Sequence, residues 1–407
     1  MTKKTRLLIL LGCIILFLLA APYIVLYSLG YRVDFLHRKI VATGGIYVKA
    51  LPQGVTIKVD SNTTTTGLLN SYVFVKNLLP SNYSVSITKS GYFDYQKTLP
   101  VTEKEVTKLE TVTLFKQKYL FTSLFNFSEK QSKRSIVTWS DDSKRAIISE
   151  NNDYFLLNLS LEPATVTPLP VLTGAKDIHF NAQNTSELFF LKNGNLYSTL
   201  QTAPIESGVI AYMVNNQTVT WLGADGLLYT TNIPIALTTK MTLQPLPIKK
   251  TTTYTLKSIA GNTYLQNGTT LLRFSPTTAL FENVYTPVTA LILSPNASHL
   301  LYCNDHEILV SLSNGKNIVS INKVSGLVKD CSWVNDNYVM YSVNDSILIS
   351  ETNTQGNVNT IILPSTITLP NNTIIAIQAP QLVINQQDKK LYLFTQNQLF
   401  SSERLVP

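Results

Sequence analysis

Two histidines and two cysteines in the C-terminal part of the chain are of types that could bind a metal ion. His299, Cys303 and His306 lie within one short stretch, and Cys331 follows further along. A zinc ion would need all four side chains to converge at about 2.0–2.3 Å. On a strand, residues 299 and 303 share a face but lie about 13 Å apart. We therefore expect unrelated structural residues here, with no metal and no cofactor.

The chain has three cysteines, too few for a dense disulfide framework. Cys13 lies in an apolar N-terminal run, whereas Cys303 and Cys331 lie far downstream. We expect the latter two to be buried free thiols. The alternative is a disulfide between neighbouring repeats.

Motifs that would define a common catalytic site do not occur. The sequence holds no Gly-x-Ser-x-Gly elbow, HExxH, phosphate-binding loop or GxGxxG. Asp141-Asp142 and Asn304-Asp305 suit turns, where Asp and Asn stabilise the turn itself. Trp139, Trp221 and Trp333 fit core packing better than a sugar-binding platform. We expect no catalytic residues and no enzyme.

Charge is sparse and unevenly placed. The 407 residues are 44% hydrophobic and only 14% charged, which excludes disorder for most of the chain. Residues 1–40 hold six basic and one acidic residue (+5), and residues 41–407 hold 27 basic and 24 acidic residues (+3). A nucleic-acid-binding domain normally carries a basic stripe, so we expect no nucleic-acid partner.

Residues 7–29 form a run without any charge, bounded by Leu7 and Leu29 with Leu16 near its middle. At about 1.5 Å per residue this run spans about 34 Å, enough for a bilayer core. Tyr27 and Tyr31 lie near its far end, as in an interfacial aromatic belt. A cleaved signal, a lipoprotein signal and a buried core helix all fit less well than a single membrane anchor.

The orientation that we expect places residues 1–6 in the cytoplasm and the body of the chain outside it. Basic residues flank the run on both sides, so the positive-inside bias is slight. A juxtamembrane linker over residues 30–43 would follow the anchor. The expected location is the plasma (inner) membrane, crossed once.

Alternating hydrophobicity begins at Gly44 and predicts a small antiparallel β-sandwich over residues 44–116. Turn residues separate the candidate strands, which are 46–50, 55–59, 72–75, 83–87 and 106–114.

Four segments of this stretch form an ordered set of motifs: Ile46-Tyr47-Val48 with Leu51 through Val55, Val59-Asp60, Leu78-Leu79-Pro80 with Tyr83-Ser84-Val85, and Lys89-Ser90-Gly91-Tyr92. In these segments the stretch resembles the PEGA domain family, although Val55 stands where the family has alanine. The resemblance implies a surface-located, non-catalytic β-sandwich, often close to a membrane anchor.

Residues 117–407 contain a recurring unit of short strands and polar turns. Its third strands are expected to be centred near residues 156, 197, 229, 272, 309, 348 and 392. A period of about 39 residues is typical of a β-propeller, here of about seven blades. The unit resembles WD-repeat and TolB-type propellers in its turns Ser140-Asp141-Asp142-Ser143 and Ser294-Pro295-Asn296-Ala297. Residues 119–127 are expected to add an outer strand to the last blade.

Together these patterns predict a mainly β protein: a membrane-anchored cell-envelope protein whose sandwich and propeller form a non-catalytic interaction scaffold. The expected partner is an envelope protein or a cell-wall glycan. The alternative is a propeller enzyme or a binder of small ligands or glycans at the cell surface. A sensor that signals through the helix fits less well, because the tail of six residues is short.

Overall fold

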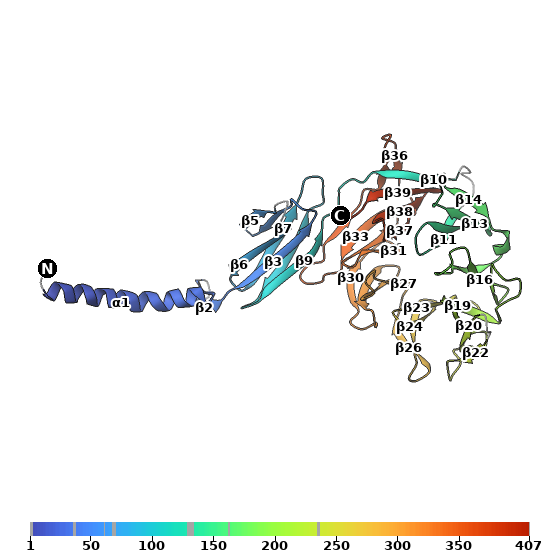
Figure 1. The fold of residues 1–407 in the computed structure, drawn as a ribbon, viewed down its shortest axis with the longest axis horizontal. Helices are drawn as coiled ribbons and strands as arrows, with labels where there is room; N and C mark the ends of the chain where they lie inside the picture. The colour runs from blue at the N-terminus through green and yellow to red at the C-terminus, as the bar shows by residue number, and fades with distance from the viewer. Residues whose placement is uncertain are drawn as a thin grey trace. The chain divides into compact units, whose positions relative to one another are not determined.

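The computed structural model describes residues 3–35, 38–60, 62–66, 71–127, 134–161, 163–233 and 237–406. The chain divides into two compact units, each built mainly from strands (Figure 1). The N-terminal unit comprises the chain up to residue 117 together with residues 353–359, and the second unit holds the rest. The predicted mainly β class is confirmed.

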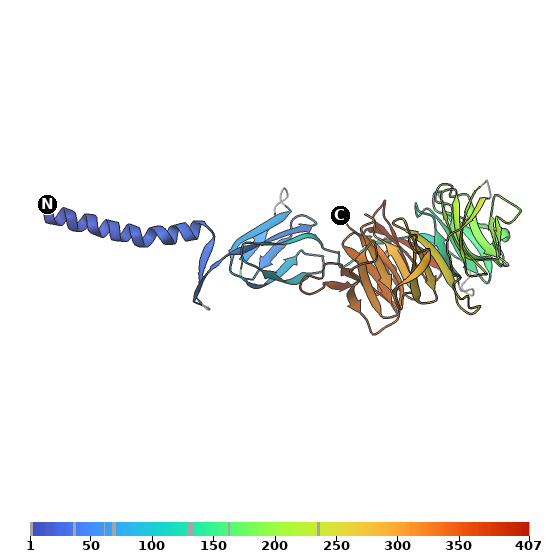
Figure 2. The same ribbon diagram turned by 90° about the horizontal axis from the view of Figure 1, so that it is seen from below.

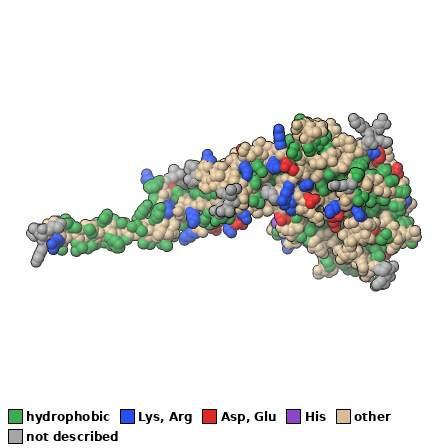
Figure 3. All heavy atoms as spheres, turned by 45° about the horizontal axis from the view of Figure 1, so that its top comes forward, with side chains coloured by type: hydrophobic (Ala, Val, Ile, Leu, Met, Phe, Trp, Pro, Cys, Tyr) green, Lys and Arg blue, Asp and Glu red, His purple; other side chains and the backbone are tan. Residues whose placement is uncertain are grey.

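Helix α1 spans Lys3–Ser28 and is apolar on all sides, with Pro22 inside it. Its segment Thr5–Ser28 is long and apolar enough to cross a membrane, judged by length and composition. Leu7 and Leu16 of the predicted run are exposed on it, and Figure 3 shows hydrophobic side chains along the helix. The helix ends one residue before Leu29, because the chain turns there into a strand.

Within residues 30–43, the predicted linker, two strands pair antiparallel: β1 (Tyr31–Asp34) and β2 (Lys39–Ala42). Tyr31 is therefore a strand residue beyond the helix. Arg32 ties β1 to the helix end: its guanidinium carbon lies 3.5 Å from the Tyr27 ring centroid. Arg32 Nη1 also donates to the carbonyl oxygens of Tyr27 at 2.9 Å and Tyr31 at 2.8 Å.

Two sheets form the predicted sandwich, which Figures 1 and 2 draw in blue and cyan. One correction concerns its pairing, since β3 and β9 run parallel; β9 returns beside β3 after β8 of the other sheet. The three-stranded sheet has the order β6 (Tyr72–Leu78), β3 (Gly44–Leu51), β9 (Val106–Thr113), and the four-stranded sheet has the order β5 (Asn62–Thr65), β4 (Thr56–Val59), β7 (Ser81–Thr88), β8 (Tyr95–Val101).

Alternation along the strands builds the sandwich core. Ile46 and Val48 of β3 are fully buried, as are Val85 and Ile87 of β7. These side chains meet between the two sheets because successive residues of a strand point to opposite faces. The five predicted strands are confirmed, whereas β5 and the Pro-containing β8 were not predicted.

The second unit is a series of seven four-stranded antiparallel sheets, and we call it the seven-sheet unit. In Figure 1 the sheets follow one another in chain order around a common centre. The sheets are: first, β11 (Arg134–Trp139), β12 (Arg145–Glu150), β13 (Asp153–Asn158), β14 (Thr165–Pro168); second, β15 (Lys176–Phe180), β16 (Leu188–Lys192), β17 (Asn195–Ser198), β18 (Glu206–Ser207); third, β19 (Val209–Asn215), β20 (Thr218–Gly223), β21 (Leu228–Asn232), β22 (Leu237–Lys240); fourth, β23 (Tyr254–Ile259), β24 (Asn262–Asn267), β25 (Thr270–Ser275), β26 (Leu280–Tyr285); fifth, β27 (Ala290–Leu293), β28 (His299–Cys303), β29 (Glu307–Leu312), β30 (Val319–Lys323); sixth, β31 (Val328–Asn335), β32 (Tyr338–Val343), β33 (Ser346–Glu351), β34 (Thr360–Ile362); seventh, β37 (Gln381–Asn385), β38 (Lys390–Thr395), β39 (Gln398–Arg404), β10 (Phe121–Asn126).

The first strand of each sheet (β11, β15, β19, β23, β27, β31 and β37) is called its leading strand here. Leading strands of neighbouring sheets lie side by side, for example β11 with β15, β27 with β31, and β31 with β37. The ends of these strands therefore gather near the centre around which the sheets are placed.

The seventh sheet joins the two ends of the seven-sheet unit. β10 pairs antiparallel with β39, as predicted for residues 119–127, with Phe121 opposite Ser402 and Asn126 opposite Gln398. Six of the seven predicted third-strand centres fall on third strands, but residue 392 lies in β38, the second strand of its sheet. The spacing fails there because a hairpin of β35 (Thr366–Thr368) and β36 (Ile374–Ala376) lengthens the preceding connection.

Residues 353–359, in the loop between β33 and β34, pack with β8 in the N-terminal unit, which the predicted boundary at residue 116 did not foresee. Lys97 Nζ donates to the carbonyl oxygens of Asn353 and Asn357, each at 2.8 Å. Gly356 has φ +73°, and a Cβ there would lie 2.0 Å from the carbonyl oxygen of Thr98. A glycine is therefore needed at this contact.

Cys303 and Cys331 form a disulfide, so the expectation of free thiols is wrong. The bond joins β28 of the fifth sheet to β31 of the sixth, which lie side by side with a Cα–Cα distance of 6.8 Å. Sequence could not establish this proximity, because it depends on how neighbouring sheets face each other.

Two glycines with the same backbone conformation allow a matched test of the packing. Gly226 has φ +80°, and a Cβ there would lie 2.0 Å from the Leu246 carbonyl oxygen, whereas Gly261 has φ +75° and open space. Gly261→Ala should cost about 1 kcal/mol for the left-handed conformation alone. We expect Gly226→Ala to lower the thermal unfolding midpoint clearly further, since the backbone must also move. Equal midpoints would contradict this packing.

Candidate functional site

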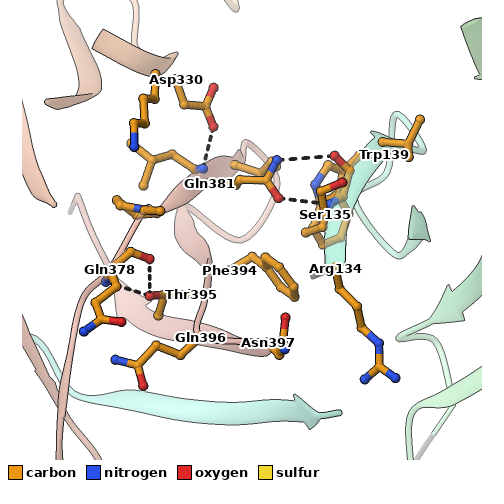
Figure 4. A pocket seen from close by; sticks show the side chains of 17 residues that line it. Arg134, Ser135, Trp139, Asp330, Gln378, Gln381, Phe394, Thr395, Gln396 and Asn397 are labelled. Atoms are coloured by element: carbon orange, nitrogen blue, oxygen red, sulfur yellow. Dashed lines mark hydrogen bonds between the residues drawn. The ribbon is translucent and has the colours of Figure 1, made fainter. Parts of the chain in front are cut away.

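A cavity of about 970 Å³ opens among the leading strands of the first, sixth and seventh sheets, and we call it the seam cavity (Figure 4). The loop before β37 and the turn between β38 and β39 complete its wall. Its lining residues are Arg134, Ser135, Ile136, Val137, Trp139, Lys329, Asp330, Gln378 through Val383, and Phe394 through Asn397.

Gln381 connects the seventh sheet to the first across this cavity. Its Oε1 accepts a hydrogen bond from the backbone N–H of Ile136 at 2.9 Å, and its Nε2 donates to the carbonyl oxygen of Ile136 at 3.4 Å. Figure 4 shows the amide directed at β11 by both bonds. One amide thus satisfies both backbone groups of a strand residue, as a paired strand would.

Asp330 connects the sixth sheet to the seventh. Its Oδ2 accepts the backbone N–H of Leu382 at 2.7 Å, and its Oδ1 accepts that of Cys331 at 2.9 Å. Burial raises the pKa of Asp330 to about 6, an increase that these two hydrogen bonds only partly offset. The carboxyl group therefore titrates close to neutral pH.

Aromatic rings supply the apolar part of the wall. Trp139 is half-buried and packs 5.6 Å from the Tyr392 ring, and Phe394 is buried. The expectation of core packing holds for Trp333 and Trp221, which are buried, whereas Trp139 also faces the cavity. The lining of the seam cavity thus combines two aromatic residues with nine polar or charged ones.

The basic groups of the cavity differ in their pairing. Arg134 is almost fully buried and forms an ion pair with Glu150, with Nη2 at 2.9 Å from Oε2. Its guanidinium also lies 4.7 Å from the ring centroid of Phe127. Lys329 is exposed at the rim. The arginine is thus held by the fold, whereas the lysine side chain is exposed to solvent.

Hydrogen bonds hold the loop at the cavity rim. Thr395 Oγ accepts the backbone N–H of Gln378 at 2.9 Å and donates to its carbonyl oxygen at 2.7 Å. Gln396 Nε2 donates to the carbonyl oxygen of Ala376 at 2.7 Å. The side chain of Gln378 is exposed. Its amide group therefore faces solvent at the rim, while the hydrogen bonds to Thr395 hold its backbone in place.

A second cavity, of about 530 Å³, lies at the same end of the leading strands. Its wall includes the first residues of β15, β19 and β23 and the turn Asn193-Gly194 between β16 and β17. The seam cavity is likewise lined by the starts of leading strands and by a turn between second and third strands. Both cavities therefore open on one face of the unit, the face where leading strands begin.

Asp177 forms an ionisable cluster in this second region, at a bulge in β15 with φ +50°. Its Oδ1 lies 2.8 Å from His179 Nε2, and its carbonyl oxygen accepts the hydroxyl of Tyr212 at 2.6 Å. Burial lowers the pKa of Lys257, an effect that the nearby Asp177 partly opposes. Sequence reasoning missed this cluster, although the Asp-x-His spacing places both side chains on one strand face.

The residues singled out for metal binding do not assemble. Both cysteines are in the disulfide, His299 Nδ1 lies 2.7 Å from Ser298 Oγ, and His306 Nδ1 lies 3.0 Å from the Gly326 carbonyl oxygen. Among the described residues no group of three potential ligands could hold a metal ion. The remaining histidine, His37, lies outside the described residues.

The acidic turns have the structural role expected of them. Asp142 Oδ1 accepts the Ser140 hydroxyl at 2.6 Å and the backbone N–H of Lys144 at 3.0 Å. Asn304 Oδ1 likewise accepts the backbone N–H of His306 at 2.9 Å. These carboxylate and amide groups stabilise turns between first and second strands or between second and third strands.

Comparisons with known proteins identify part of the chain. Residues 43–116 match the model of the PEGA domain. No curated protein matches the sequence. Two crystal structures of the extracellular domain of one B. thetaiotaomicron protein, described as a hybrid two-component system and as a one-component system, each align with a TM-score of 0.50 and 12% identity. Each alignment covers 70% of this chain but only 39% and 40% of the matched chains, so the likeness concerns the fold alone.

The raised pKa of Asp330 predicts a pH-dependent stability. The folded state holds this proton up to about pH 6, whereas an ordinary carboxyl group loses it near 3.8. As the pH rises from about 4 to about 6, the wild type should therefore lose stability relative to Asp330→Asn. Allowing for partial exposure, we expect a loss of about 1–2 kcal/mol, which persists above pH 6. Thermal unfolding of both proteins at pH 4, 5, 6 and 7 measures it, and parallel curves would contradict it.

Proposed function

We propose that this chain is a single-pass membrane protein whose extracytoplasmic body, a PEGA domain followed by a seven-bladed β-propeller, binds a partner without catalysing a reaction. Seven four-stranded sheets with adjacent leading strands support the blade count. The strand exchange in the seventh sheet and the Gln381 bond between the seventh and first sheets support a closed ring. The ring presents the partner site on the face where leading strands begin.

The proposed location rests on the helix and the disulfide. An apolar helix of this length could span a bilayer, which supports an anchor in the plasma (inner) membrane. Disulfides persist in oxidising compartments and are rare in the cytosol, so the Cys303–Cys331 bond favours a body outside the cytoplasm. The N-terminus would then be cytoplasmic.

The seam cavity is the observation that carries the proposed binding role. It combines aromatic surface, amide side chains and an exposed lysine on a backbone fixed by inter-sheet hydrogen bonds. Such a preformed surface loses little conformational entropy when a partner binds. A protein segment or a glycan chain would fill a cavity of this size.

The alternative, a hydrolase of glycans, needs two carboxyl groups about 5–10 Å apart. The lining residues of the seam cavity include a single carboxyl group, that of Asp330. Both of its oxygens accept backbone N–H groups. This composition favours binding over catalysis.

Thiol counting tests the location. Membranes from cells that express the full chain are denatured and treated with a maleimide-linked polymer, with and without prior reduction. One of the three cysteines, Cys13, should react without reduction and all three after it. Cys303→Ser should add one reactive thiol, that of Cys331. Three reactive thiols without reduction would contradict an extracytoplasmic body.

Site-specific photocrosslinking in cells tests the binding face. A photoreactive residue in place of Gln378, at the cavity rim, should capture a defined partner. The control is the same residue in place of Gln217, which is exposed in the turn between β19 and β20, at the other end of the strands. Capture from position 217 alone, or equal capture from both, would contradict the proposed face.

A further inference from the structure

The outer face of the three-stranded sheet in the PEGA domain carries aromatic and basic side chains that take no part in the hydrophobic core. Along β3 the buried residues alternate with Tyr47 and Lys49, which point away from the core. Register places Tyr47 between Phe74 of β6 and Lys108 of β9. This face therefore has a central row of two aromatic rings and a lysine.

Three rings form one cluster on this face, which we call the aromatic platform. Tyr47 and Tyr72 stack with centroids 5.4 Å apart, and Phe74 meets Tyr47 edge-on at 6.4 Å. Tyr72 is 49% and Phe74 41% exposed. A Cβ on Gly45 would lie 2.8 Å from the Phe74 ring, so the glycine leaves room for that ring to lie over the strand.

Lysines surround the platform. Lys49 lies opposite Tyr72 in the register, and Lys76 Nζ lies 5.1 Å from the Phe74 ring centroid. Lys108 completes the set and lies 3.6 Å from Glu110, with both side chains largely exposed. Three lysines and one glutamate give this face a formal charge of +2.

The outer face of the other sheet is different in kind. Its exposed or half-buried positions carry hydroxyl and amide groups and one lysine, and they include Thr56, Lys58, Ser84, Ser86, Gln96 and Thr98. Of the two outer sheet faces, that of the three-stranded sheet therefore carries the aromatic cluster and more of the lysines. Exposed apolar groups gathered on one face commonly mark an interaction site.

We propose that this face binds an acidic polysaccharide. Aromatic rings pack against the C–H faces of sugar rings, and lysines attract the carboxylate or phosphate groups of the polymer. An extended polymer suits a sheet face, whereas small ligands need a concave site. The Phe74 ring lies along the strand rather than projecting as a wedge, which favours a sugar chain over insertion into a lipid bilayer.

This inference rests on the proposed extracytoplasmic location in one respect: only there would the domain meet such a polymer. The binding itself is measured on purified full-length protein in detergent. Thiol counting can therefore contradict the proposed location while the purified protein still binds the polymer. Conversely, binding can be absent although thiol counting supports the location.

Four soluble polymers separate the contributions to binding. Polygalacturonate carries sugar rings and carboxylates, and poly(glycerol phosphate) with attached glucose carries sugar and phosphate. Polyglutamate has charge without sugar rings, and dextran has sugar rings without charge. We expect immobilised protein to bind one or both of the first pair, more weakly as salt is added, and neither of the second pair comparably.

Variants then map the binding face. Tyr72→Ser with Phe74→Ser, and separately Lys49→Gln with Lys76→Gln and Lys108→Gln, should each weaken binding at least about tenfold. Lys58→Gln, on the opposite sheet, should leave binding within about twofold. All altered side chains are exposed or partly exposed, so unchanged thermal midpoints confirm folding.

Four outcomes would overturn the proposal. They are equal binding of polyglutamate, equal losses in Lys58→Gln, no loss in either set of platform variants, and no binding to either polygalacturonate or the glucose-bearing poly(glycerol phosphate).

Discussion

Hydrogen bonds from a side chain of one leading strand to the backbone of a neighbouring leading strand fix each sheet of the seven-sheet unit to at least one neighbour. A four-stranded sheet cannot bury both faces alone, so each must be fixed against its neighbours. Five such links are present among the described residues: the hydroxyl of Tyr212 to Asp177, Lys257 Nζ to Leu291, the indole N–H of Trp333 to Ile292, Asp330 to Leu382, and Gln381 to Ile136. The residues differ chemically, yet each bonds to a backbone group of a neighbouring leading strand.

These links also define what the central region can do. Asp330 and Gln381 hold sheets together and line the seam cavity at the same time. A ligand that enters it therefore meets groups whose positions are set by the sheet arrangement, with little freedom to adapt. Lys257 shows what burial of such a group costs. Loss of hydration lowers the pKa of its ammonium group, which donates a hydrogen bond to the carbonyl oxygen of Leu291.

The periodicity of the sequence predicted those helices and strands that depend on the local pattern of apolar and polar residues. Alternation located five strands of the sandwich and six of seven third strands, and the apolar run located the helix. Features that depend on distant contacts were not predicted: the parallel β3–β9 pair and the packing of residues 353–359 were missed, and the disulfide was only the alternative to free thiols. One residue of the cavity could have been singled out from the sequence. Asp330 lies three residues before Trp333, whereas the equivalent position of the first repeat, three residues before Trp139, holds the apolar Ile136.

The pairing of β10 with β39 has a consequence for biosynthesis. These strands are separated by most of the seven-sheet unit, so β10 leaves the ribosome long before its partner exists. Until then its exposed edge is open to pairing with other chains. The seventh sheet can be completed only once β39 has been synthesised, so the final step of folding would coincide with the arrival of the last strand.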